Sequence, residues 1–114
     1  MNIYELVQKS IQEIEMNLED KIHIDQLANH IGMSESNLYR FFLSLVGYSI
    51  KEYIRLRRVS EAALLLRLGK TVTEVAFLFD YQSLDAFTRA FKKITGYLPS
   101  HYKKLNVTFV FRTS

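Results

Sequence analysis

The 114-residue sequence contains no cysteine, one proline and four glycines. Without cysteine, neither a disulfide scaffold nor a thiolate metal site can form, which favours an intracellular protein. The apolar runs are at most five residues long, as in Ala62–Leu66, which is too short to span a membrane. The N-terminus lacks the basic start and the apolar stretch of a signal peptide. We therefore expect a soluble cytoplasmic domain.

Charge is distributed unevenly along the chain. Lysine and arginine number 15 and acidic residues 12, for a net charge of +3. Residues 1–24 contain two basic and five acidic side chains, a net of −3, so the remaining 90 residues hold 13 basic and seven acidic groups, a net of +6. This basic body favours a polyanionic partner, although so modest an excess is common. With 48% hydrophobic residues, the chain has the composition of a globular domain.

Apolar residues recur every three or four positions over most of the chain, which is typical of amphipathic helices. The glycines and the proline stand where helices should begin or end. The pattern predicts an all-α fold of about seven helices. Only the tail, Val107–Phe111, alternates as a strand does, and it has nothing nearby to pair with.

An internal repeat is the most informative feature of the sequence. Its first part matches at an offset of 48, and after one inserted residue the offset becomes 49. The pairs at offset 48 join Leu27, Ala28, Ile31, Gly32 and Met33 with Val75, Ala76, Phe79, Asp80 and Tyr81. Those at offset 49 join Leu38, Arg40, Phe42, Gly47, Tyr48 and Tyr53 with Phe87, Arg89, Phe91, Gly96, Tyr97 and Tyr102.

Each copy is predicted to be a short helix, a tight turn and a second helix. In the first copy, helix 25–31 is followed by a turn at Gly32, and Ser34 can cap a helix that runs to about Val46. In the second, Thr71–Glu74 is a capping-box pattern for a helix that runs through residue 79, and Ser83 can cap a helix to Thr95. This is the helix-turn-helix arrangement, whose second helix can enter the DNA major groove.

The two copies are predicted to be subdomains joined by a long central helix. The expected organisation is a first helix-turn-helix subdomain at 1–48, a linking helix at 49–68, a second subdomain at 69–104 and a tail at 105–114. A helix of 18–20 residues spans about 27–30 Å, close to the roughly 34 Å between successive major-groove faces. The two second helices could therefore reach adjacent groove segments without a dimer. The tail is either the start of a further domain or the frayed end of a stand-alone regulator.

The sequence resembles the DNA-binding domain of the AraC/XylS family of bacterial transcription regulators, which includes the MarA-like proteins. The resemblance covers about residues 3–104. In the first unit it rests on Ile24–Ala28, Gly32–Ser34, Leu38–Phe42, Gly47–Ser49, Tyr53–Arg58 and Ala62. In the second it rests on Val72–Ala76, Tyr81–Ser83, Phe87–Lys93 and Gly96–Tyr102.

Four positions depart from the family pattern. Asp80 stands where the family usually has glycine, and Asp tolerates a left-handed turn at some cost. His23 replaces the expected capping Ser or Thr, so the first helix of the repeat should begin loosely. Leu84 and Asp85 occupy exposed positions at the start of the second reading helix, where uncharged polar residues are more usual. They weaken the case for base reading by the second copy.

The resemblance and the expected exposed faces give the candidate contacts. We expect a buried stripe of Leu38, Phe41, Phe42 and Leu45 in the first reading helix, and of Phe87, Ala90, Phe91 and Ile94 in the second. The expected base contacts are Ser36, Tyr39, Arg40, Asp85, Thr88 and Arg89. The expected backbone contacts are Ser34, Asn37, Lys51, Ser83, Lys92 and Lys93.

The function that follows is a sequence-specific double-stranded DNA-binding module of a regulator, an activator by resemblance. The resemblance also implies RNA polymerase as a partner, and a small-molecule effector only through a domain outside this chain. The alternative is a helical protein-interaction domain that no longer reads bases, which Leu84 and Asp85 favour.

Other chemistry has little support in the sequence. Among Arg55, Arg57 and Arg58, at least one is expected to be structural, bridging the two units rather than touching DNA. The three histidines lack metal-site spacing, and no phosphate-binding glycine loop or nucleophile motif is present. The sequence therefore predicts no enzyme, no metal and no cofactor.

Overall fold

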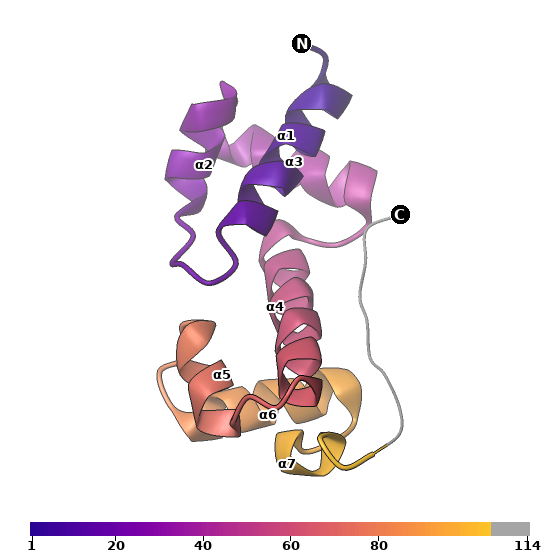
Figure 1. The fold of residues 1–114 in the computed structure, drawn as a ribbon. Coiled ribbons are helices and arrows are strands. Elements are labelled where there is room, and N and C mark those ends of the chain that lie inside the picture. The colour runs from indigo at the N-terminus through magenta and orange to yellow at the C-terminus, as the bar shows by residue number, and fades with distance from the viewer. Residues whose placement is uncertain (106–114) are drawn as a thin grey trace. The chain divides into compact units, whose positions relative to one another are not determined.

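The computed structural model describes residues 1–105, in which there are seven α-helices and no strand (Figure 1). The helices are α1 (Ile3–Met16), α2 (Ile24–Ile31), α3 (Glu35–Val46), α4 (Ile50–Arg67), α5 (Val72–Leu78), α6 (Leu84–Thr95) and α7 (Pro99–Tyr102). The all-α prediction is confirmed. The strand expected at Val107–Phe111 lies outside the described residues.

The chain divides into two compact units, and the boundary between Ile54 and Arg55 falls inside α4. Unit 1 ends at Ile54 and unit 2 begins at Arg55. Each unit contains one copy of the repeat. The subdomain boundaries expected from the sequence remain a prediction.

In unit 1, α1, α2 and α3 pack against one another and enclose an apolar core. Leu38 and Phe42 of α3 are fully buried there, together with Ile14 of α1. The ring of Phe42 meets that of Tyr53 edge to face, with centroids 5.4 Å apart. The Tyr53 hydroxyl donates to Glu15 Oε2 at 3.2 Å, so the phenol is both buried and hydrogen-bonded.

In unit 2, α5 packs on α6 and α6 on α7, around a row of aromatic rings. The ring of Phe87 lies 5.2 Å from that of Tyr81 and 5.7 Å from that of Phe91, and the Phe91 ring lies 5.4 Å from Tyr102. Phe87, Phe91 and Tyr102 are at most 1% exposed. Large aromatic side chains bury much apolar surface each, so this row supplies much of the unit's core.

The predicted caps fix the starts of the helices. Ser34 Oγ accepts from the Asn37 N–H at 3.2 Å, and Ser83 Oγ accepts from the Ala86 N–H at 3.0 Å. Thr71 and Glu74 form the predicted capping box, each side chain accepting from the other's backbone N–H. The bond from the Thr71 N–H lowers the pKa of Glu74 below its ordinary value. α2, in contrast, has His23 at its N-cap position and no side-chain cap hydrogen bond, as expected.

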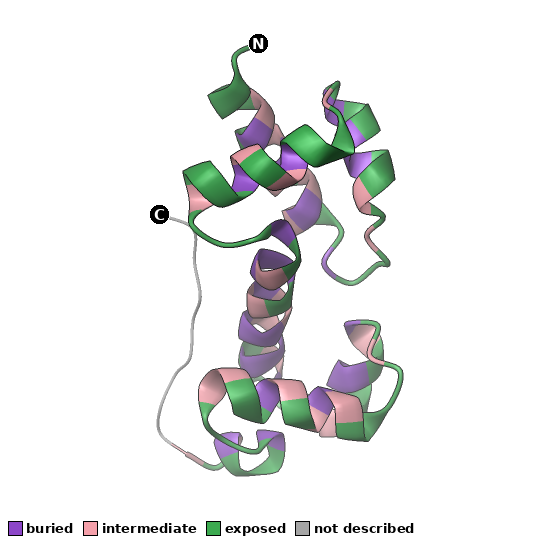
Figure 2. Ribbon diagram, turned by 180° about the vertical axis from the view of Figure 1, so that it is seen from behind, coloured by how far each residue is buried: buried purple, intermediate pink, exposed green. Residues whose placement is uncertain are grey.

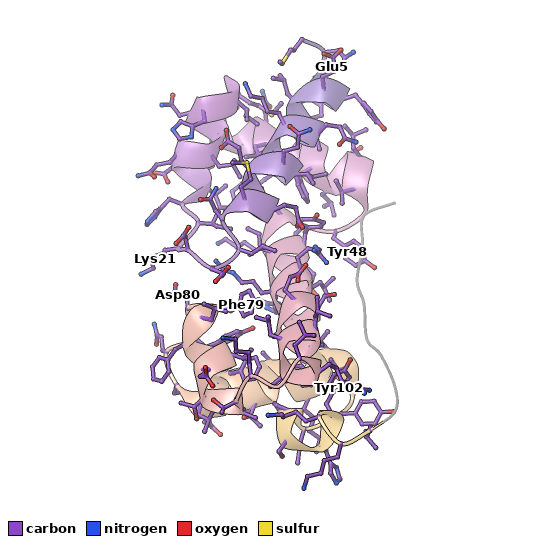
Figure 3. The ribbon with its side chains drawn as sticks, viewed as in Figure 1. Glu5, Lys21, Tyr48, Phe79, Asp80 and Tyr102 are labelled. Atoms are coloured by element: carbon purple, nitrogen blue, oxygen red, sulfur yellow. The ribbon has the colours of Figure 1, made fainter. Side chains whose placement is uncertain are left out.

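The two helix-turn-helix turns use different residues for the same left-handed backbone. Gly32 has a φ of 78° in the first turn, and Asp80 has a φ of 62° in the second. Figure 3 labels Asp80 beside Phe79, just after α5. Phe79 is buried whereas Asp80 is exposed, so the chain turns here without burying the carboxylate. The sequence-based expectation of a left-handed Asp80 is confirmed.

This turn gives a first testable prediction. Asp80→Ala should lower the free energy of unfolding by about 1 kcal/mol, because alanine bears the left-handed strain without the local hydrogen bonding of a short polar side chain. Asp80→Asn, which tolerates that conformation, should stay close to the original protein. Urea denaturation followed by circular dichroism measures both. Equal midpoints for the alanine variant and the original would contradict the account.

Candidate nucleic-acid interface

The exposed face of α3 is the first candidate reading surface. Its cap, Ser34, is exposed, as are Ser36, Asn37 and Arg40, whereas Tyr39 is half-buried. Figure 2 shows buried, intermediate and exposed residues following one another along α3, as in a helix with one packed face. The face opposite the buried Leu38 and Phe42 is therefore available to a ligand.

Arg40 is held by its neighbours on the same helix. Its Nη2 donates to Asn37 Oδ1 at 3.1 Å, and its guanidinium carbon lies 4.8 Å from the centroid of the Phe41 ring. Lys51 Nζ, at the start of α4, lies 5.9 Å from the centroid of the Tyr39 ring. Four expected contacts of unit 1 thus form two pairs, Asn37 with Arg40 and Tyr39 with Lys51.

The exposed face of α6 is the second candidate reading surface. Asp85, Arg89, Lys92 and Lys93 are exposed along it, and Ser83 is an exposed cap at its start, whereas Thr88 is half-buried. Arg89 Nε lies 3.2 Å from Asp85 Oδ2, and the two side chains are 75% and 79% exposed. Lys92 and Lys93 lie in the last turn, where positive charge complements the helix dipole.

The buried stripes differ from the expectation in detail. Leu38 and Phe42 are fully buried, but Leu45 is 47% exposed and Phe41 is half-buried, so the predicted burial of Leu45 is wrong. The spacing of apolar residues shows which face of a helix is packed. It does not show at which turns a neighbouring element covers that face. In α6, Phe87 and Phe91 are buried as predicted, and Ala90 and Ile94 are half-buried. Leu84 is 47% exposed, as expected.

The three arginines of α4 have different surroundings. Arg57 is 9% exposed, and its Nη2 donates to Glu61 Oε1, one helical turn later, at 2.8 Å. Arg57 is therefore structural, as expected of at least one of the three. Its bridging role between the units remains a prediction. Arg55 is exposed.

Arg58 connects α4 electrostatically with the second turn, which the sequence did not reveal. Burial lowers the pKa of Arg58, and the charges of Asp80 and Tyr81 oppose that shift. Burial likewise raises the pKa of Tyr81, against the charges of Arg58 and Arg55. An acidic residue at the turn position is thus matched by a cation in the same unit.

Other kinds of site find little support in residues 1–105. No three histidine, cysteine or acidic side chains are grouped there so that they could hold a metal ion. His30 Nδ1 lies 3.5 Å from Glu13 Oε2, and the histidine side chain is 66% exposed. No helix in this part of the chain is long and apolar enough to cross a bilayer.

The side chains on the exposed faces of α3 and α6 suit a nucleic acid, which has charged phosphates and hydrogen-bonding groups on its base edges. Arginine can bind the O6 and N7 atoms of guanine in bidentate fashion. Lysines, capping hydroxyls and the N–H groups at helix starts suit phosphate oxygens. Each helix has a capping serine and an exposed arginine at the same repeat position, Arg40 or Arg89, and the exposed lysines among the expected contacts lie on α6 and at the start of α4.

Comparisons with known proteins agree with this architecture. A family model for a helix-turn-helix domain matches residues 27–105. The F1 operon positive regulatory protein of Yersinia pestis is 46% identical over 101 residues, covering 87% of this chain and 34% of that protein. The transposon Tn10 TetD protein of Escherichia coli is 38% identical over 92 residues, covering 80% of this chain and 67% of that protein.

A solved structure shares the fold as well. The DNA-binding domain of AdpA, a global transcriptional factor, was determined in complex with a target DNA. It superimposes with a TM-score of 0.76 at 27% identity, covering 86% of this chain and 88% of that one. The chain spans about a third of the length of the Yersinia regulator and two thirds of TetD.

Proposed function

Since the chain belongs to the AraC-type helix-turn-helix family of transcription regulators, we propose that it binds double-stranded DNA sequence-specifically. The helices α3 and α6 are the reading helices. Ser36, Tyr39 and Arg40 contact bases from α3, and Asp85, Thr88 and Arg89 contact bases from α6. The two helices read two adjacent major-groove segments.

One observation carries this proposal: the same reading surface is built twice. Each unit has a serine-capped second helix, Ser34 for α3 and Ser83 for α6, and an exposed arginine at the corresponding position. A helix pair with a tight turn is common in proteins that bind no DNA. Repetition of the cap, the turn and the arginine in one chain is what distinguishes a reader from a packing motif.

Phosphates are contacted by a second group of residues, namely Ser34, Asn37, Lys51, Ser83, Lys92 and Lys93. Its three lysines are all exposed. Each phosphate that a cation neutralises should lower log K by about 0.9 per unit of log salt, so these lysines alone predict a slope of about −2.7. Fluorescence anisotropy with a labelled duplex, titrated with NaCl, measures that slope.

Single lysine variants make this test specific. Lys92→Ala and Lys93→Ala should each reduce the magnitude of the slope by about 0.9. Lys21→Ala, which removes an exposed cation between α1 and α2, is the matched control and should leave the slope unchanged. A flat salt dependence of the original chain would reject DNA binding. It would favour a helical protein-interaction domain, for which the exposed Leu84 would be a contact.

The wider role concerns the whole protein. By analogy with the positive regulatory protein of Yersinia pestis, we propose activation of transcription, with RNA polymerase as the partner and the cytoplasm as the compartment. Catalysis has no part in the proposal. An effector, where there is one, would bind a domain other than these two units, because the match covers only 34% of the Yersinia regulator.

A further inference from the structure

The two reading helices hold their arginines in different ways. In α6 the partner of Arg89 is a carboxylate, Asp85, one turn earlier, and the contact is made through Arg89 Nε at 3.2 Å. In α3 the partner of Arg40 is an amide, Asn37, and the contact is made through Arg40 Nη2 at 3.1 Å. In the repeat, Asp85 corresponds to Ser36 and Asn37 corresponds to Ala86, so only the second unit has a carboxylate at this position.

The atoms that remain free decide what each arginine can do. A guanidinium has five N–H donors in a planar fork. With Nε facing Asp85, both terminal nitrogens of Arg89 are left for the O6 and N7 atoms of guanine. In Arg40, by contrast, the terminal nitrogen Nη2 already donates to Asn37, and the guanidinium lies against the Phe41 ring. Arg89 is therefore the better oriented of the two for end-on, bidentate reading.

Folding does not account for the Asp85–Arg89 pair. Both side chains are more than 70% exposed, and such pairs contribute little to stability because water screens them. Asp85 does lie in the first turn of α6, where the helix dipole favours an acidic residue. If Asp85 had no part in recognition, however, its carboxylate would only repel the phosphates of the DNA.

Building on the proposed function, we infer that Asp85 and Arg89 read DNA as one unit. Arg89 binds a guanine while Asp85 Oδ2 holds its Nε. The other carboxylate oxygen, Oδ1, accepts from the exocyclic amino group of a cytosine or adenine beside that guanine. Guanine and thymine present only acceptors in the major groove, so Asp85 rejects them at that neighbouring position. Asp85 is thus a specificity-determining residue and not a defect of the second copy.

The test uses duplexes randomised over roughly 20 base pairs, two turns of B-DNA, enriched separately by the original chain and by its variants. Asp85→Ala should lose the preference for an amino-bearing base at one position, about tenfold in relative affinity. It should also weaken the preference for the adjacent guanine. Asp85→Asn, which keeps the shape but can also donate, should accept all four bases there. Glu19→Ala removes an exposed carboxylate outside the reading helices and should leave all preferences unchanged.

A double variant separates coupled reading from simple charge repulsion. Arg89→Ala leaves Asp85 unpaired in the groove, so adding Asp85→Ala should restore part of the lost affinity, whereas Asp85→Ala alone should weaken binding to the selected site. Simple repulsion by the carboxylate would instead raise the affinity in both backgrounds. The thermal unfolding of each variant, compared with that of the original chain, confirms that the fold is intact. If the original chain selects a site and Asp85→Ala changes affinity equally for every duplex, the inference is wrong while the proposed function stands. If the original chain selects no site, both are wrong.

Discussion

Phe91→Ala is expected to lower the free energy of unfolding by about 3–5 kcal/mol. The Phe91 ring is fully buried and lies at the centre of the aromatic row, between Phe87 and Tyr102. Truncation removes its apolar contacts and leaves a cavity that the rigid neighbouring rings cannot fill. Urea denaturation followed by circular dichroism measures the loss.

Phe77 provides a control of the same residue type in the same unit. Its side chain is 70% exposed on α5, so Phe77→Ala should change stability by less than about 0.5 kcal/mol. A similar loss in both variants would contradict the core described for unit 2. Should Phe91→Ala fail to fold, Phe91→Leu tests the same contacts with a smaller cavity and should still cost more than Phe77→Ala.

The second large effect concerns DNA. Arg40→Ala and Arg89→Ala should each weaken binding to the selected site by about 1–3 kcal/mol, the discrimination that a bidentate arginine supplies. Neither change should affect folding, because both side chains are exposed. The losses should fall on the specific site, and affinity for unrelated duplexes should drop far less. Competition binding with specific and scrambled duplexes measures the difference.

Lys21→Ala is the control for the loss of one positive charge. It removes an exposed cation that belongs to neither reading helix. Any loss of affinity should be the same for specific and scrambled duplexes. Equal affinity of Arg40→Ala, Arg89→Ala and the original chain for the selected site would reject the assignment of base contacts. Equal losses on specific and scrambled duplexes would reassign both arginines to phosphates.

Much of the fold can be predicted from the sequence because its signals are local. Ser34, Thr71 and Ser83 are capping residues in the right places, and each accepts the expected hydrogen bond. The repeat relates Asp80 to Gly32, and both adopt the left-handed backbone that this alignment implies. The Asp85–Arg89 pair is not among the sequence predictions, although the i, i+4 spacing of opposite charges on a helix was the signal that could have found it.

The parts that could not be predicted depend on tertiary packing. Leu45 continues the apolar period of α3 yet is 47% exposed, because burial requires a neighbouring element at that turn. The sequence could not show which α4 arginine is buried, since Arg55, Arg57 and Arg58 are chemically alike and differ only in the direction they face. The roles of the site residues depend on DNA and remain predictions.

The central claim is that two helices of one chain read two blocks of a single DNA site. The direct measurement is enrichment of bound duplexes from a random double-stranded library at about 150 mM salt, near physiological ionic strength. We expect a site of roughly 20 base pairs with two separated specific blocks, one for each reading helix. A single block, with the other helix merely holding the backbone, would contradict the two-helix claim, and the absence of any enriched sequence would contradict DNA reading altogether.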